Sequence, residues 1–408
     1  MPIANGIFKK VAYKKQATWG APITGATGGQ RVPRVTSDID LSKNTYRSNN
    51  IRDDMQRADM RHGTRMVKGK IAGELTIGAH KDFYETFCRQ LWQVASTTGA
   101  LITVAAATTT QAMGTFTRSA GSFLTDGFKL GDVGRWAGWT TTGVNNNGKN
   151  VMIIGLTATV MTAITLDGSA IATKAAGDSV TFTLKGKKTW VPLAGHTNDS
   201  YTIEHFYSDI NESEYFDSCR LASLNANLPA TGMATVEFEF MGRDMGTQTG
   251  AYFVSPTAVS TGSTLAAVNG VLIVAGVAVG IITGLSISGT ANATTGECVG
   301  SNVTPDVFMG SVDVTGTITA YFSDVSLRNL FKDETEASVM CAFTADNGAG
   351  SEFLSFVLPR VKAGGATKDD GEKGLVITMP FTALLNTAGG AAANSLATTL
   401  SIQDSSVV

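Results

Sequence analysis

Two stretches of the chain alternate strictly between apolar and polar residues, and each is followed by a helical pattern. The stretches lie at residues 67–77 and 310–320. Alternation with a period of two predicts a strand of about ten residues with one buried face. The residues expected on the buried faces are Val67, Ile71, Leu75 and Ile77 with two glycines in the first stretch, and Val312, Val314 and Ile318 in the second. Apolar residues then recur at helical spacing at Tyr84, Phe87, Cys88 and Leu91, and at Leu327, Leu330 and Phe331, which predicts a short amphipathic helix in each copy.

The two strand–helix pairs are related by a constant shift along the sequence. A shift of 243 positions places residues 67–88 on residues 310–331, with Gly73 on Gly316 and Thr76 on Thr319. Further strand-like stretches flank both pairs, at 35–41, 219–228 and 233–241 in the first copy and at 282–288, 352–361 and 375–384 in the second. The sequence therefore predicts one module encoded twice, each copy a small β-barrel or sandwich with one short α-helix.

The first copy is interrupted where the second is not. Residues 98–188 contain turn signals at Asp126-Gly127, Asn147-Gly148 and Asp167-Gly168, with strand-like stretches at 151–156 and 159–166. A long insertion in a surface loop costs little free energy, because the cost of loop closure grows slowly with length. We therefore expect a mainly β protein in which residues 1–97 and 189–250 form the first module, 98–188 an inserted small β domain, and 251–408 the second module.

One uncharged stretch imitates a membrane span. Residues 270–285 are apolar, but they are fewer than the roughly 20 that a spanning helix needs, and four glycines divide them. Two or three strands joined by glycine turns are the better interpretation.

Composition and motifs give no indication of catalysis. Among 408 residues with a net charge of −2, the four histidines form no metal-binding pair, and nucleophile-elbow, P-loop and dinucleotide motifs are missing. The four cysteines are far apart in the sequence, so we expect reduced thiols with no disulfide framework or zinc site. Trp136 and Trp139 could form a sugar-stacking platform, but a packing role in the inserted domain is favoured. We expect no enzyme activity, no cofactor and no bound metal.

A charged run at residues 43–65 links two strands of the first copy and is too polar to pack inside the module. It could be a solvated loop, a weak nucleic-acid arm, or an extended hairpin that docks on a neighbouring subunit. Mixed signs of charge favour docking on protein over binding phosphate. The candidate docking residues are Arg47, Arg52, Asp53, Asp54, Arg57, Asp59, Arg61 and Arg65.

Several segments together resemble the tail tube proteins of long-tailed, siphovirus-type bacteriophages. The resemblance is carried by residues 8–20 (FKKVAYKKQATWG), the strand–helix pairs, the GSFxxDGFxxGD stretch at 121–132, LPRVK at 358–362 and MPFTAL at 379–384. It implies a subunit whose inner strands join neighbours edge to edge in a ring, and rings that stack into a hollow tube. Because the module is duplicated, three chains would supply the six modules of such a ring.

The resemblance also implies roles for particular residues and partners. The polar faces of the two alternating strands would line the channel, where mixed or weakly acidic character would let DNA slide, and the charged run would connect successive rings. The candidate lumen residues are Lys68, Lys70, Glu74, Thr76, Ser311, Asp313, Thr315, Thr317 and Thr319. Implied partners are further copies of the chain, the tape measure protein and viral DNA in the lumen, and the tail terminator and distal tail proteins at the ends. The implied location is the virion tail, with assembly in the host cytoplasm and no membrane insertion.

A different class of function stays open from the sequence. A phage or bacterial surface protein could use the inserted domain to bind a receptor or carbohydrate. Such a protein would remain monomeric or form a single closed trimer, whereas a tube protein would form stacked rings.

Overall fold

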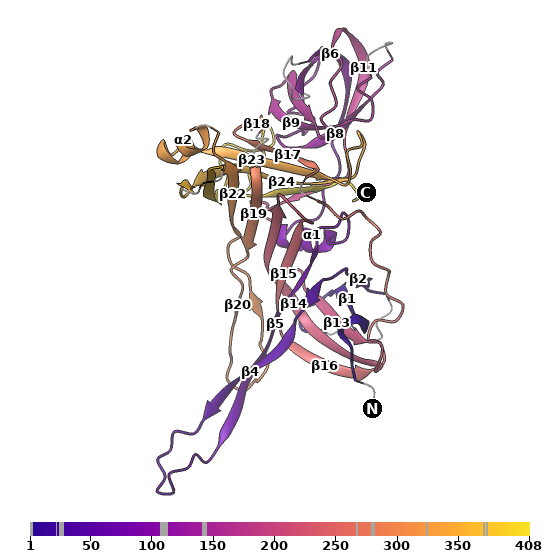
Figure 1. Ribbon diagram of the computed structural model, residues 1–408. Helices are drawn as coiled ribbons and strands as arrows, with labels where there is room; N and C mark the ends of the chain where they lie inside the picture. The colour runs from indigo at the N-terminus through magenta and orange to yellow at the C-terminus, as the bar shows by residue number, and fades with distance from the viewer. Residues whose placement is uncertain are drawn as a thin grey trace.

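The computed structural model shows an elongated molecule with a long hairpin at one end and a separate barrel at the other (Figure 1). It describes residues 3–21, 23, 28–106, 113–140, 145–266, 268–278, 282–323, 325–369, 372 and 374–408. The described chain is mainly β, with two short α-helices and a 3-10 turn at Gly6–Phe8.

A continuous central sheet runs through both halves of the chain. Starting from the hairpin, its strands pair in the order β4–β5–β15–β14–β19–β22–β26, with β3 beside β4 on β5 and with β24 and β25 along β26. The bounds are β3 Thr36–Ser37, β4 Asp40–Arg47, β5 Met60–Glu74, β14 Glu212–Pro229, β15 Thr235–Gly242, β19 Ile282–Thr290, β22 Asp313–Tyr321, β24 Phe353–Ala363, β25 Thr367–Lys368 and β26 Val376–Ala383.

Each half adds a flanking sheet that packs on the central one. In the first half the order is β2–β1–β13–β14–β16, and in the second it is β12–β27–β24–β23–β17–β18. The bounds are β1 Lys9–Lys15, β2 Gln30–Arg31, β12 Lys187–Trp190, β13 Tyr201–Tyr207, β16 Asp244–Thr249, β17 Gly270–Val274, β18 Val277–Ala278, β23 Ala337–Thr344 and β27 Ser401–Asp404. The long strands β14 and β24 each pass from a flanking sheet into the central sheet. Apolar side chains from both layers form one contiguous core.

The two halves have the same order of elements and the same strand pairing. Eight elements of the first half have counterparts, in the same order, in the second half. The first series is β1, β3–β4, β5, α1, β13, β14, β15 and β16, and the second is β17, β19, β22, α2, β23, β24, β26 and β27. In both halves the strand before the helix pairs with the third of the recurring strands after it, β5 with β15 and β22 with β26. The predicted fold class is thereby confirmed: two tandem mainly β modules, each with one short helix.

The predicted strand–helix pairs are present, with one error at a helix end. The residues expected on the buried faces of the two strands are buried, apart from the half-buried Val312 and Gly69. The helices are α1 Lys81–Cys88 and α2 Ser326–Lys332. Leu91 was expected on the first helix, but Arg89 adopts a left-handed conformation with φ 56° and ends the helix there. Leu91 consequently lies outside it and is exposed.

The stretch between α1 and β12 forms a closed six-stranded barrel with its own apolar core. Its strands are β6 Thr97–Ala106, β7 Met113–Arg118, β8 Val133–Ala137, β9 Asn150–Leu156, β10 Val160–Thr165 and β11 Lys174–Leu184. The three predicted turn glycines, Gly127, Gly148 and Gly168, all have positive φ. One side of the barrel packs on the outer face of the second flanking sheet, where Val133 and Met152 meet Met340 and Phe353. The strand that follows the barrel, β12, joins that sheet as well.

The described residues of the apolar stretch, 270–278 and 282–285, form strands and a turn, as predicted, and residues 279–281 lie outside the described part of the chain. The stretch contains β17, β18 and the start of β19, and Ala275 and Gly276 both adopt positive φ in the turn between the first two. Neither helix in the described part of the chain has the length and apolar character needed to cross a membrane.

Candidate self-assembly surfaces

The polar face of the central sheet runs without interruption across both modules. One row of facing residues crosses six strands, from β5 to β26, and consists of Ala72, Glu237, Asn225, Ser288, Thr315 and Thr382. Hydroxyl and amide side chains dominate it, and Ser288 Oγ donates to Asn225 Oδ1 over 2.5 Å. The face is therefore a hydrophilic surface formed jointly by the two modules.

The candidate lumen residues on β5 and β22 lie on this face, whereas Ser311 precedes β22 and Thr76 follows β5. Lys68, Glu74, Ser311, Asp313 and Thr315 are exposed, whereas Lys70, Thr317 and Thr319 are half-buried by their neighbours. Thr76 does not belong with them: it follows the end of β5, is buried, and its hydroxyl donates to the carbonyl oxygen of Glu74. Alternation stops at the strand end, so polarity at position 76 no longer indicates the polar face.

Two carboxylates missing from the candidates, Glu237 and Glu239 of β15, stand on the same face. Lys70 Nζ lies 2.8 Å from Glu237 Oε2, and this hydrogen bond and its charge raise the pKa of Lys70. With Lys68, Glu74 and Asp313, the strands β5, β15 and β22 present two lysines and four carboxylates on this face. The strand neighbours of Glu237 and Glu239 could not be identified from the sequence without the pairing. The balance on this part of the face is weakly acidic.

The two modules meet at a seam between β14 and β19. Seven residues of each strand face one another, from Ser223 opposite Thr290 to Pro229 opposite Gly284. On the core side of this seam, Ala226 lies opposite Ile287, and both are 1% exposed. The seam is thus a fully paired and buried junction between like modules.

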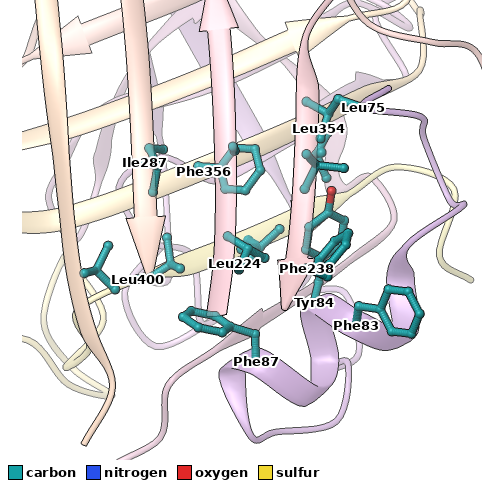
Figure 2. Close-up of a cluster of buried hydrophobic side chains, with 14 of the residues drawn as sticks. Leu75, Phe83, Tyr84, Phe87, Leu224, Phe238, Ile287, Leu354, Phe356 and Leu400 are labelled. Carbon is teal, nitrogen blue, oxygen red and sulfur yellow. The ribbon is translucent and has the colours of Figure 1, made fainter. Parts of the chain in front are cut away.

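Helix α1 lies under the seam and contacts both modules (Figure 2). Phe83 packs against Phe238 and Phe240 of its own module, with ring centroids 5.0 and 5.2 Å apart. Tyr84 meets Phe356 of the second module, and a Cβ added at Gly289 would lie only 2.2 Å from Phe87 Cζ. Burying an aromatic side chain contributes about 1.5–3 kcal/mol. The helix therefore stabilises the junction as well as its own module.

The charged run forms an arm, defined here as residues 40–66, that projects from the body as the β4–β5 hairpin (Figure 1). At its tip the charges pair internally: Arg52 forks onto Asp54 with a closest contact of 2.6 Å, and Arg61 Nε lies 2.7 Å from Asp59. Arg57 donates to the carbonyl oxygen of Ser48. These local pairs hold the tip in shape.

Two apolar side chains at the arm tip were overlooked in the sequence because the run is so polar overall. Ile51 and Met55 are 100% and 98% exposed. Arg65, by contrast, lies at the base of the arm, where Nη2 is 3.0 Å from Asp244 Oδ2. The exposed group at the tip therefore contains Arg47, Arg52, Asp53, Asp54, Arg57, Asp59 and Arg61 together with Ile51 and Met55.

The second module has a counterpart of the arm that is folded down. Its β19–β22 connection includes a small ribbon, β20 Thr294–Thr295 with β21 Val307–Phe308. This connection lies on the first module: the amide of Arg65 donates to Asn302, Trp19 Nε1 donates to Pro305, and Arg220 pairs with Asp306 at 2.9 Å. The connection between the equivalent strands thus projects from the body in the first module and lies against the body in the second.

The inserted barrel does not present its tryptophans. Trp136 and Trp139 are 1% and 5% exposed and lie in the barrel core beside Phe116 and Phe182. The packing interpretation is confirmed and the sugar-platform interpretation is wrong for these residues. In the GSFxxDGFxxGD stretch, Asp132 forms a buried ion pair with Lys188 at 2.8 Å and so fastens the barrel to β12.

Two histidines and three of the four cysteines are buried in the fold. Burial lowers the pKa of His80 to about 4 and the pKa of His205 to about 3, so both rings are neutral at pH 7. All four cysteines are free, and only Cys298 is exposed. Within the described residues, no group of three or more His, Cys, Asp or Glu side chains is placed to hold a metal ion.

The fold and these surfaces define a mainly β structural protein of two like modules, joined through a common sheet and carrying an inserted barrel. A sequence model of the phage tail tube protein family matches residues 9–383, and the chain belongs to that family. A search among curated proteins gives no match. The protein is accordingly a structural component of a bacteriophage tail tube and of the virion tail.

Proposed function

We propose that three chains close into a ring of six modules, that rings stack into a hollow tube, and that viral DNA passes through the tube into the host. The observation that carries this proposal is the β14–β19 seam, in which one module already joins the next through strand edges. An unpaired strand edge favours uncontrolled association with other chains. In a closed ring each such edge is paired with the edge of the neighbouring chain.

In this assembly the polar face of the central sheet lines the channel. Its hydroxyl and amide groups and its weakly acidic balance support that orientation, because a basic lumen would release counterions from DNA and hold it in a salt-dependent way. The opposite face of the sheet is the apolar core and is unavailable.

The arm connects one ring to the next. Its exposed apolar tip and its internally paired charges suit a protein surface better than phosphate. The tape measure protein would occupy the lumen before DNA does, and the tail terminator and distal tail proteins would cap the two ends. Subunits would assemble in the host cytoplasm.

Electron microscopy of the purified protein tests the proposal directly. Negative-stain images should show rings of three 42.6-kDa chains and stacks of rings with a central hole, appearing above a threshold concentration. Native mass spectrometry should give trimers and multiples of trimers. A protein that stays monomeric at every concentration, or stops at a trimer with no hole, would overturn the tube and favour a receptor- or carbohydrate-binding role.

A further inference from the structure

The two helices occupy equivalent places but differ in burial. Five of the eight residues of α1 are buried, whereas α2 has no buried residue. Leu327 and Leu330 stand where Tyr84 and Phe87 stand in α1, yet they are only half-buried, and Phe331 is 44% exposed. The second module covers α1, whereas no described part of the chain buries a residue of α2 on the same side.

The strand edges show the same asymmetry. Gly73 of β5 faces Val236, and Val236 in turn faces Ala226 at the seam. In the second module, Gly316 faces Phe381, which faces Ala363. Ala363 is therefore the counterpart of Ala226. It is half-buried at the open edge of β24, whereas Ala226 is buried at the seam.

The other side of the seam has a counterpart in the first module. Ile287 of β19 faces Gly316, and the amide of Val35 donates to Ala72, beside Gly73, at the start of β3. Val35 thus occupies the place of Ile287, but it is 63% exposed where Ile287 is 1% exposed. The chain therefore has the two strand edges needed for a second seam, one at Val35 beside β3 and one at Ala363 of β24, but these edges are not paired with each other.

We propose that these halves join in trans, so that the β3 edge of one chain pairs with the edge formed by residues 361–365 of the next, with Val35 opposite Ala363. The register is copied from the internal seam, where Ile287 lies opposite Ala226. The first module of the incoming chain then covers α2 as the second module covers α1. The partner at this surface is a second copy of the same chain, because the two edges correspond to the strands that already pair with each other at the internal seam. This inference rests on the proposed ring and specifies its contacts.

Paired cysteines test the register. In a Cys298→Ser background, Val35→Cys with Ala363→Cys places two thiols on facing positions of the core side, with Cβ atoms about 4.5–5.5 Å apart. An added mild oxidant takes two electrons and two protons from each pair to form the disulfide. The matched control, Thr36→Cys with Ala363→Cys, moves one thiol to the opposite face of the sheet.

Non-reducing gels should show linked dimers and a closed covalent trimer for the first pair, at least tenfold more than for the control. Amide exchange in α2 should slow on assembly while exchange in α1 stays unchanged. If tubes form but their chains are not linked by disulfides, or are linked to the same extent in the control pair, the register is wrong and the tube proposal still stands. Absence of both rings and linkage would overturn the two together.

Discussion

At the scale of single residues, periodic alternation identified the buried positions of the two repeated strands, because a strand with one buried face repeats every two residues. Val67, Ile71, Val314 and Ile318 are all buried as expected. The patterns could not identify positions beyond the end of an element, as Thr76 after strand β5 and Leu91 after helix α1 show. Those depend on where the backbone leaves its regular conformation, and the left-handed Arg89 gives no sequence signal of its own.

Gly289 is predicted to be essential for the junction between the modules. A Gly289→Ala substitution would place its Cβ 2.2 Å from Phe87 Cζ, so the helix or the strand must shift. Overpacking of this kind costs about 1–3 kcal/mol. Thermal or urea unfolding should show that loss. Gly284→Ala on the same strand is the matched control, since its Cβ would come no closer to another residue than 3.9 Å, from Thr319 Cβ. Equal stability of the two variants would contradict the role given to Phe87.

At the scale of elements, the sequence predicted both helices, the strands β5, β14, β15, β19, β22, β24 and β26, and the strands of the apolar stretch, but not β13 or β23 of the flanking sheets. Strands such as β13 and β23 are buried on both faces, so they lack the alternation that marks a half-buried strand. The arm was recognised by its charge. Its apolar tip was not, because two apolar residues among many polar ones carry no periodic signal. Only the hairpin geometry brings Ile51 and Met55 to one end.

The arm tip is predicted to be needed for stacking and not for folding. Reversing charge at Arg52, Arg57 and Arg61 to Glu sets like charges beside Asp54 and Asp59, and Ile51→Ser with Met55→Ser removes the apolar contact. Both variants should melt like the native subunit and still form single rings, with tube length reduced several-fold by electron microscopy. Val94→Ser, at a position that is 82% exposed but outside the arm, should leave tubes unchanged. Full-length tubes from both arm variants would remove the arm from the ring-to-ring contact.

At the scale of the whole molecule, the duplication was visible in the sequence, but the seam was not. Gly73 and Gly316 indicate equivalent positions, while the pairing of β14 with β19 joins residues 55 to 67 positions apart in the sequence and depends on how the two modules pack. The same holds for the barrel. Its turns were predictable from Gly127, Gly148 and Gly168, whereas its attachment through Asp132 and Lys188 required the fold.

The layering of the molecule predicts which surface is inside the tube. The polar face of the central sheet and the barrel lie on opposite sides of the two packed sheets, so a ring that encloses the first must carry three barrels on its outside. In a Cys298→Ser background, Thr315→Cys reports the polar face and Ala170→Cys the barrel, and both positions are exposed in the subunit. A maleimide attached to a polymer of several kilodaltons should modify both in free subunits. In tubes it should modify Ala170→Cys as before and Thr315→Cys at least tenfold less, since the polymer is hindered from entering the lumen. Protection of the barrel thiol with an accessible Thr315→Cys would mean that the sheet faces the other way.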